Sequence, residues 1–148
     1  MIIYIRHGES TGEGSNPELS ENGREMAEAA AKWLHRKGYT PMCIVTTTKR
    51  RTGETAEIVA NHGWSQGWTP EIIQRPGSVR TQPEWEELVA LVGDSGAFVG
   101  HHPTQHLLMR LAGAPEAPKD NRCVVYVVER AGEGWRCVAH WEGRPKSR

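Results

Sequence analysis

Short apolar runs, bounded by glycine, proline and polar residues, alternate with amphipathic stretches along the chain. Short apolar runs between turn signals are typical of buried β-strands, whereas apolar positions three and four residues apart are typical of helices. The pattern predicts strands at residues 2–5, 42–47, 71–74, 97–100, 123–130 and 135–141. It predicts helices at 20–37 and 50–62, and two more that begin near Pro83 and Pro103.

Residue type also indicates where these helices begin and end, and which side faces the core. Ser20 is expected to cap the first helix and Gly38 to end it. Residues 63–70 hold three glycine or proline residues, so we predict a loop after the second helix. The inner face of the third helix is expected to carry its aliphatic residues, Leu88, Val89 and Leu91.

Alternation of strands and helices predicts an α/β fold. We expect a three-layer sandwich in which a mostly parallel central sheet carries helices on both faces. The last two strands, joined by a glycine turn, are expected to form a C-terminal antiparallel hairpin at the sheet edge. With 148 residues, the chain is expected to form a single domain, 1–148.

Composition excludes several classes of function. Lys plus Arg number 18 and Asp plus Glu also 18, so no basic field favours nucleic acid. No apolar stretch approaches the roughly 18 residues of a membrane span, and no signal-peptide pattern opens the chain. Three cysteines without a C-x-x-C pair favour reduced thiols and a cytoplasmic location. The basic run 144–148 is interpreted as a solvated tail.

Cationic and imidazole side chains follow three of the predicted strands. Arg6 and His7 end the first strand, residues 49–51 (Lys-Arg-Arg) follow the second, and His101 and His102 follow strand 97–100. Because ligands of such sheets bind beyond the carboxyl ends of the parallel strands, we expect these groups to meet at one edge. The sequence therefore predicts a local anion site, in which arginine forks suit phosphate oxygens.

Two histidines within an anion site indicate phosphoryl transfer rather than binding alone. A neutral imidazole can attack phosphorus, and water can then cleave the phosphohistidine. A second, protonated imidazole can stabilise charge on the transferring group while two arginines hold its oxygens. Such a site needs no metal and no cofactor. Gly8 is interpreted as letting the backbone approach the ligand.

Four segments resemble motifs of the histidine phosphatase superfamily, also called phosphoglycerate mutase-like. They are IIYIRHGES (2–10), LSENGREMA (19–27), TTTKRRTGETAEI (46–58) and FVGHHP (98–103), in the family's order. The resemblance implies a phosphoglycerate mutase-like fold with His7 as nucleophile. It also implies that Arg6, Arg51 and His101 complete the phosphate pocket, and its register selects Arg51 rather than Arg50.

The chain departs from the family pattern at several positions. Thr46 and Thr47 replace the usual serines, and Thr52 and Glu54 replace an alanine and, often, a glutamine. The interval before the second histidine segment is short, and no glutamate there aligns with the general acid of larger members. This compactness resembles the SixA branch of phosphohistidine phosphatases.

Two groups of residues offer alternative chemistry. Glu86 and Glu87 are candidate proton donors, although acids such as these and Glu84 also favour the first turn of a helix. His102 and His106 stand four apart, as metal ligands on a helix do. However, Pro103 is expected to leave His102 outside the helix, and no third ligand is evident, so we predict no metal.

The sequence thus predicts a metal-independent phosphatase that acts through a phosphohistidine on His7. Its substrate is expected to be a phosphorylated small molecule or a phosphohistidine protein, and neither nucleic acid nor a membrane is an expected partner. The short interval before His101 leaves little chain for a lid, which predicts an open pocket. The alternatives are a phosphomutase of the same superfamily and a catalytically silent phosphate-binding protein.

Overall fold

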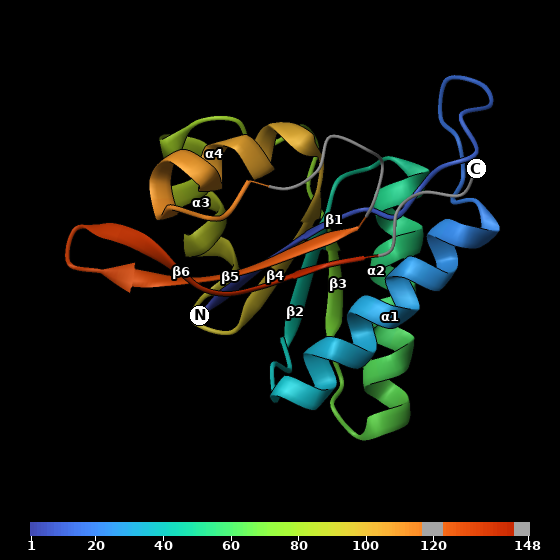
Figure 1. Ribbon diagram of the computed structural model, residues 1–148, viewed down its shortest axis with the longest axis horizontal. Coiled ribbons are helices and arrows are strands. Elements are labelled where there is room, and N and C mark those ends of the chain that lie inside the picture. The colour runs from blue at the N-terminus through green and yellow to red at the C-terminus, as the bar shows by residue number, and fades with distance from the viewer. Residues whose placement is uncertain (117–122, 144–148) are drawn as a thin grey trace.

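The computed structural model describes residues 1–116 and 123–143, so the predicted tail at 144–148 lies outside the described residues. Six strands and four helices lie within the described part (Figure 1). The strands are β1 (Ile2–Arg6), β2 (Cys43–Thr46), β3 (Glu71–Gln74), β4 (Gly96–Gly100), β5 (Val124–Ala131) and β6 (Gly134–Glu142). The helices are α1 (Glu21–Lys37), α2 (Arg50–Gln66), α3 (Gln82–Val92) and α4 (His102–Ala112).

The described strands form one sheet in the order β3-β2-β4-β1-β5-β6. Strands β1 to β4 pair in parallel, whereas β5 runs antiparallel to β1 and pairs with β6 as the terminal hairpin. Helices α1 and α2 lie on one side of the sheet, and α3 and α4 on the other (Figure 1). The predicted three-layer α/β architecture with an antiparallel C-terminal edge is confirmed.

Both faces of the central strands are buried, which explains why the strand sequences are continuously apolar. In β1, Ile3 and Ile5 pack into the core beneath α1 and α2. Ile2 and Tyr4 point to the other face and pack into the core shared with α3 and α4. This two-sided burial fixes the register of β1 and therefore the positions of the residues that follow it.

Helix α2 runs four residues further than predicted, to Gln66, so the expected loop 63–70 begins too early. Gly63 lies inside the helix, where a Cβ atom would meet the ring of Trp68 at 2.8 Å. The glycine is therefore a packing residue rather than a helix breaker. Gly67, in the left-handed conformation, ends the helix instead.

Helix α3 faces the core with part of the predicted set, and Val89 packs against the core as a partly buried residue. Leu88 is buried as expected, but Leu91 is 52% exposed. Trp85 and Val92 occupy the inner face instead. The expected helix start is confirmed, since Pro83 lies in the first turn and Thr81 with Glu84 forms a capping box.

The chain crosses closely over α1 directly after β1. A Cβ atom on Gly8 would lie 2.4 Å from the Gly23 carbonyl oxygen, and one on Gly23 would lie 1.9 Å from the Glu9 oxygen. The missing side chain of Gly8 therefore lets the chain pass close to α1, whereas its approach to a ligand stays a prediction. Ser20 caps α1 as expected, with its side chain accepting from the Gly23 N–H.

No helix in residues 1–116 or 123–143 is long and apolar enough to cross a membrane.

Candidate active site

The pairing of β1 with β4 brings the two predicted histidines together. Arg6 lies opposite Gly100, the last residue of β4, and the His7 N–H donates to the Gly100 carbonyl at 3.2 Å. Each histidine follows its strand by one residue, so both leave the sheet at the same edge. The rings of His7 and His101 lie 5.3 Å apart, centroid to centroid, in an edge-to-face arrangement.

His7 is nearly buried, with 8% of its surface exposed. Its Nδ1 lies 2.7 Å from the Gly8 carbonyl oxygen, which can only accept, so this pattern places the proton on Nδ1. The Nε2 lone pair then accepts from Arg51 Nε at 3.3 Å. Burial lowers the pKa of His7 to about 3, assisted by the nearby positive groups, although the Gly8 contact opposes the shift. At neutral pH His7 is therefore an uncharged imidazole whose Nε2 carries a lone pair.

His101 is held on both its backbone and its ring. Its carbonyl accepts from the buried Tyr4 hydroxyl at 2.7 Å, and its Nε2 lies 2.9 Å from Thr47 Oγ1. Thr47 in turn contacts Thr52 Oγ1 at 2.6 Å, and Thr52 donates to the Lys49 carbonyl at 3.0 Å. If Thr52 uses its proton on Lys49, Thr47 donates to Thr52 and accepts from His101 Nε2–H.

The pKa of His101 bears on its predicted role as a protonated partner of the phosphoryl group. Burial, followed by the charges of Arg51 and Lys49, lowers the pKa of His101 to about 4. With these protein groups alone around it, the ring is neutral near pH 7. A bound phosphate dianion would reverse the sign of the local charge and raise this pKa, because an opposite charge favours the protonated form.

Arg6 contributes positive charge from beneath the two histidines. It is only 6% exposed, and its carbonyl accepts from the buried Cys123 thiol at 3.0 Å. Its charge contributes to the lowered pKa of both His7 and His101.

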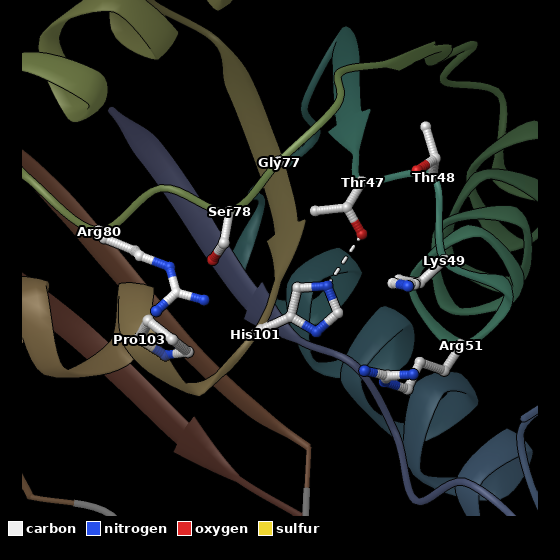
Figure 2. A pocket seen from close by; sticks show the side chains of 9 residues that line it. All are labelled: Thr47, Thr48, Lys49, Arg51, Gly77, Ser78, Arg80, His101 and Pro103. Atoms are coloured by element: carbon white, nitrogen blue, oxygen red, sulfur yellow. Dashed lines mark hydrogen bonds between the residues drawn. The ribbon is translucent and has the colours of Figure 1, made fainter. Parts of the chain in front are cut away.

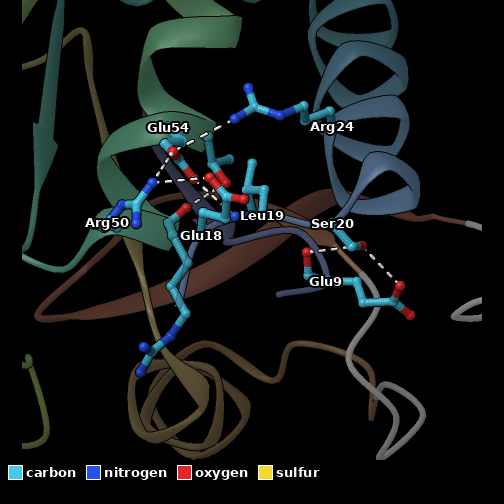
Figure 3. A network of polar contacts seen from close by, with 9 residues as sticks. Glu9, Glu18, Leu19, Ser20, Arg24, Arg50 and Glu54 are labelled. Atoms are coloured by element: carbon cyan, nitrogen blue, oxygen red, sulfur yellow. Dashed lines mark hydrogen bonds and ion pairs between the residues drawn. The ribbon is translucent and has the colours of Figure 1, made fainter. Parts of the chain in front are cut away.

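The two neighbouring arginines at the start of α2 point to different partners. Arg51 reaches His7, as described above. Arg50 pairs with Glu18 at 2.9 Å and with Glu54 at 3.6 Å, and its backbone N–H donates to the Asn16 side chain. Figure 3 shows Glu54 between Arg24 and Arg50. Arg50 therefore anchors the loop between β1 and α1 and does not enter the site, in agreement with the predicted register.

A hollow of about 330 Å³ opens beside the histidines (Figure 2). Its lining includes four basic or imidazole residues, namely Lys49, Arg51, Arg80 and His101. The rest of the lining is small or polar: Thr47, Thr48, Gly77, Ser78 and Pro103. None of the described residues that line it is acidic. An anion that enters the hollow therefore meets several positively charged side chains and no carboxylate among these residues.

Residues 2–76, about half of the chain, match the family model of the histidine phosphatase superfamily (branch 1). The chain belongs to the histidine phosphatase superfamily. A curated relative, the mitochondrial serine/threonine-protein phosphatase Pgam5 of Drosophila willistoni, is 38% identical over 63 residues. That match covers 40% of this chain but only 22% of the relative, so the chain corresponds to a small part of that protein.

Solved structures of several phosphatases share the fold over nearly the whole chain. The protein histidine phosphatase SixA in complex with tungstate superposes with a TM-score of 0.71 and 16% identity, covering 95% of this chain and 96% of that one. A protein designated phosphohistidine phosphatase SixA, from Agrobacterium tumefaciens, superposes with a TM-score of 0.69 and 20% identity, with the same coverage of both chains. A mycobacterial glucosyl-3-phosphoglycerate phosphatase superposes with a TM-score of 0.64 and 18% identity, covering 97% of this chain and 99% of that one. The expected likeness to the compact SixA fold is confirmed.

The structure does not bring the candidate proton donors to the candidate site. Glu86 pairs with Arg130 at 2.8 Å and accepts from the Trp135 indole N–H at 3.3 Å, both on the terminal hairpin. Because β5 runs antiparallel to β1, with Val128 opposite Ile2, that end of the hairpin lies at the far edge of the sheet. Glu87 is exposed and does not line the hollow.

The acid in the first turn of α3 has a structural role. Glu84 accepts from the backbone N–H groups of Arg80 and Thr81, and these contacts lower its pKa. Glu84 therefore caps the start of α3, as the preference of acids for the first turn of a helix indicates.

The histidine pair considered as metal ligands lies next to the site. The rings of His102 and His106 stand 4.2 Å apart. His102 is the first residue of α4, not outside it as predicted, because the preceding His101 is the N-cap. Among the described residues, no group of three or more His, Cys, Asp or Glu could hold a metal ion.

Sequence reasoning missed three residues of the site. Thr47 was noted only as a change from serine, yet it orients His101. Ser78 and Arg80 come from the segment after β3, which was given no role. A signal existed: β3 is parallel to β2, so residues after it leave the sheet at the same edge.

Proposed function

We propose that residues 1–148 form one phosphatase domain that hydrolyses its substrate through a covalent phosphohistidine on His7. The observation that carries the proposal is the state of His7. Its Nδ1 proton is committed to the Gly8 carbonyl, which leaves the Nε2 lone pair directed toward Arg51 and beside His101. That is the tautomer a nitrogen nucleophile needs.

The first step begins when the phosphoryl group of the substrate binds between the cations. Arg51 exchanges its contact with Nε2 for the phosphoryl oxygens, which frees the lone pair for attack on phosphorus. The Nε2–P bond forms as the bond from phosphorus to the leaving group breaks, and the leaving group departs with the electron pair. Arg6 and Arg51 neutralise the oxygens, and His101 adds a third positive group, because the dianion raises the pKa of its ring and the ring then takes a proton from solvent.

The second step returns the enzyme to its starting state. Water attacks phosphorus, the Nε2–P bond breaks, and the electron pair returns to His7 while inorganic phosphate leaves. The phosphate carries away both protons of the water, so the step balances without a further proton, and His101 beside Thr47 stabilises the charge on the phosphate. We propose that no metal ion is required, since these residues supply the charge that a metal supplies in other phosphatases.

The lining of the hollow supports a substrate with a good leaving group. Alkyl phosphates need proton donation to a poor leaving oxygen, an effect typically worth about 10²–10⁴-fold. No acidic residue is among the described residues that line the hollow. Phosphohistidine, in contrast, leaves as neutral imidazole once its ring is protonated. The fold alone does not decide between phosphohistidine and a phosphate ester as substrate, because its structural neighbours include both SixA and a glucosyl-3-phosphoglycerate phosphatase.

The experiment is a comparison of kcat/KM for a phosphohistidine peptide, p-nitrophenyl phosphate and a simple alkyl phosphate. We expect the first two to be hydrolysed and the alkyl ester to be slower by about 10² or more, the lower range of general-acid effects. An alkyl phosphate that is the best substrate would refute the proposed preference.

A further inference from the structure

The hollow carries more positive charge than the proposed reaction requires. Its volume of about 330 Å³ lies within the roughly 300–1,000 Å³ of small-molecule sites. A transferring phosphoryl group carries about −2 near neutral pH, which Arg6 and Arg51 together balance. Lys49 and Arg80 line the same hollow and add two further charges. Both residues are exposed, so a second anionic group on a bound substrate is within their reach.

The geometry of the hollow separates these cations into two places. Figure 2 shows the Arg80 side chain on one side of His101, and Lys49 and Arg51 on the other. Both Arg80 and Lys49 contribute to the lowered pKa of His101, so their charges are felt at the reacting end of the hollow. Within residues 1–116 and 123–143, neither the Arg80 guanidinium nor the Lys49 ammonium has an ion pair or a hydrogen bond.

The position of Arg80 is fixed by its neighbours. Val79 is fully buried, and its carbonyl accepts from the buried Thr104 hydroxyl of α4 at 2.6 Å. On the other side, the Arg80 N–H donates to Glu84 of the α3 capping box at 3.1 Å. The backbone of this arginine is thus anchored to two helices, which reduces the conformational freedom that ligand binding would otherwise cost.

Ser78 provides an independent sign of a ligand next to Arg80. Ser78 lines the hollow and is partly buried as a residue, whereas its Oγ atom is buried and has no hydrogen-bond partner among the described residues. Figure 2 shows the Ser78 hydroxyl beside the Arg80 side chain. An unpartnered buried hydroxyl costs stability, so a group that accepts from it would gain an unusually favourable contact.

We propose that Arg80 and Ser78, with Lys49 opposite, form a second anion subsite that selects substrates bearing an additional carboxylate or phosphate. The inference rests on the proposed function, since it presumes a phosphoryl group at His7. The guanidinium fork binds the second oxyanion, the Ser78 hydroxyl donates to it, and Lys49 adds charge. The second group can belong to a small phosphorylated acid or to an acidic side chain beside a phosphohistidine.

The test uses two unreactive ligands that differ in one group, propylphosphonate and 3-phosphonopropionate. Isothermal titration should show the carboxylate-bearing ligand binding the wild-type protein about tenfold more tightly, as expected for a charge-assisted contact. Arg80→Ala and Ser78→Ala should each reduce that ratio, and Arg80→Lys should restore part of it. Arg110→Ala, which removes the same charge from the last turn of α4, should keep the ratio.

Equal affinities for the two ligands in the wild-type protein would overturn the subsite, as would a ratio that survives Arg80→Ala. Because binding needs no turnover, hydrolysis of p-nitrophenyl phosphate by the same preparation tests the proposed function separately. Phosphohistidine peptides with a neighbouring Glu or Gln identify the source of the second anion. Faster hydrolysis of the Glu peptide supports the subsite with a protein substrate. Tighter binding of 3-phosphonopropionate without a preference between the peptides supports the subsite with a small-molecule substrate.

Discussion

Arg50 and Arg51 provide a matched pair of substitutions within one turn of α2. Both residues are arginines at adjacent positions, so Arg50→Ala and Arg51→Ala remove the same side chain and the same charge. Arg51 contacts Nε2 of His7 at 3.3 Å. Arg50 instead pairs with Glu18 and Glu54, and its side chain is 52% exposed. Only the first substitution should reach the chemistry.

The expected magnitudes follow from these contacts. Removing one preorganised donor from a transition-state oxyanion typically costs about 10²–10³ in kcat, or roughly 3–4 kcal/mol. Arg51→Ala should fall in that range. Exposed ion pairs contribute about 0–1 kcal/mol to stability, so Arg50→Ala should lower the free energy of unfolding slightly. Its kcat should change by no more than about threefold, since a surface loop anchor is all that is lost.

The assay is steady-state hydrolysis of p-nitrophenyl phosphate by both variants, with urea unfolding to measure stability. Arg51→Lys distinguishes charge from geometry, because lysine keeps the charge but lacks the planar fork. Equal losses of kcat in Arg50→Ala and Arg51→Ala, or a larger loss in Arg50→Ala, would refute the assignment of Arg51 to the site.

Three further predictions concern protonation and metals. Thr47→Val should lower kcat/KM by about tenfold, the typical cost of a lost hydrogen bond to a charged group, and should move the acid limb of the pH profile. Thr47→Ser should retain activity. Full activity in Thr47→Val would contradict the role of Thr47 in orienting His101. The pKa of His7 and of His101 is lower in the folded protein than the usual 6.5. The unfolded chain therefore binds more protons below pH 6.5, and stability should fall as pH drops, by at most about 1.4 kcal/mol per unit for each ring. Urea unfolding at pH 7 and pH 5 measures this, and His7→Asn should reduce the slope. EDTA should leave kcat unchanged, whereas loss that a divalent ion restores would contradict metal independence.

The strand ends were predictable because burial constrains them twice. Strands β1 and β4 are apolar on both faces, so their sequences stand out, and the histidines that follow them are abrupt changes of polarity. Parallel pairing then places His7 beside His101 whatever the intervening chain does. The choice of Arg51 over Arg50 came from motif resemblance, and the opposite directions of the two side chains agree with it.

The failures share a different cause, because each depends on tertiary contacts. Gly63 reads as a helix breaker, yet the helix continues since Trp68 packs against the missing side chain. Leu91 is as apolar as Leu88, but α3 turns Trp85 and Val92 inward instead. Arg80 lines the hollow beside Val79, whose carbonyl accepts from Thr104 of another element, and no local pattern predicts that contact.

The central claim is that His7 carries the phosphoryl group, and trapping that intermediate tests it most directly. Wild-type protein should be mixed with substrate labelled at phosphorus, quenched in base within one turnover, digested and mapped. The account predicts an acid-labile, base-stable label on the peptide that contains His7, and no label or turnover in His7→Ala. Label on another residue, or undiminished turnover by His7→Ala, would contradict it.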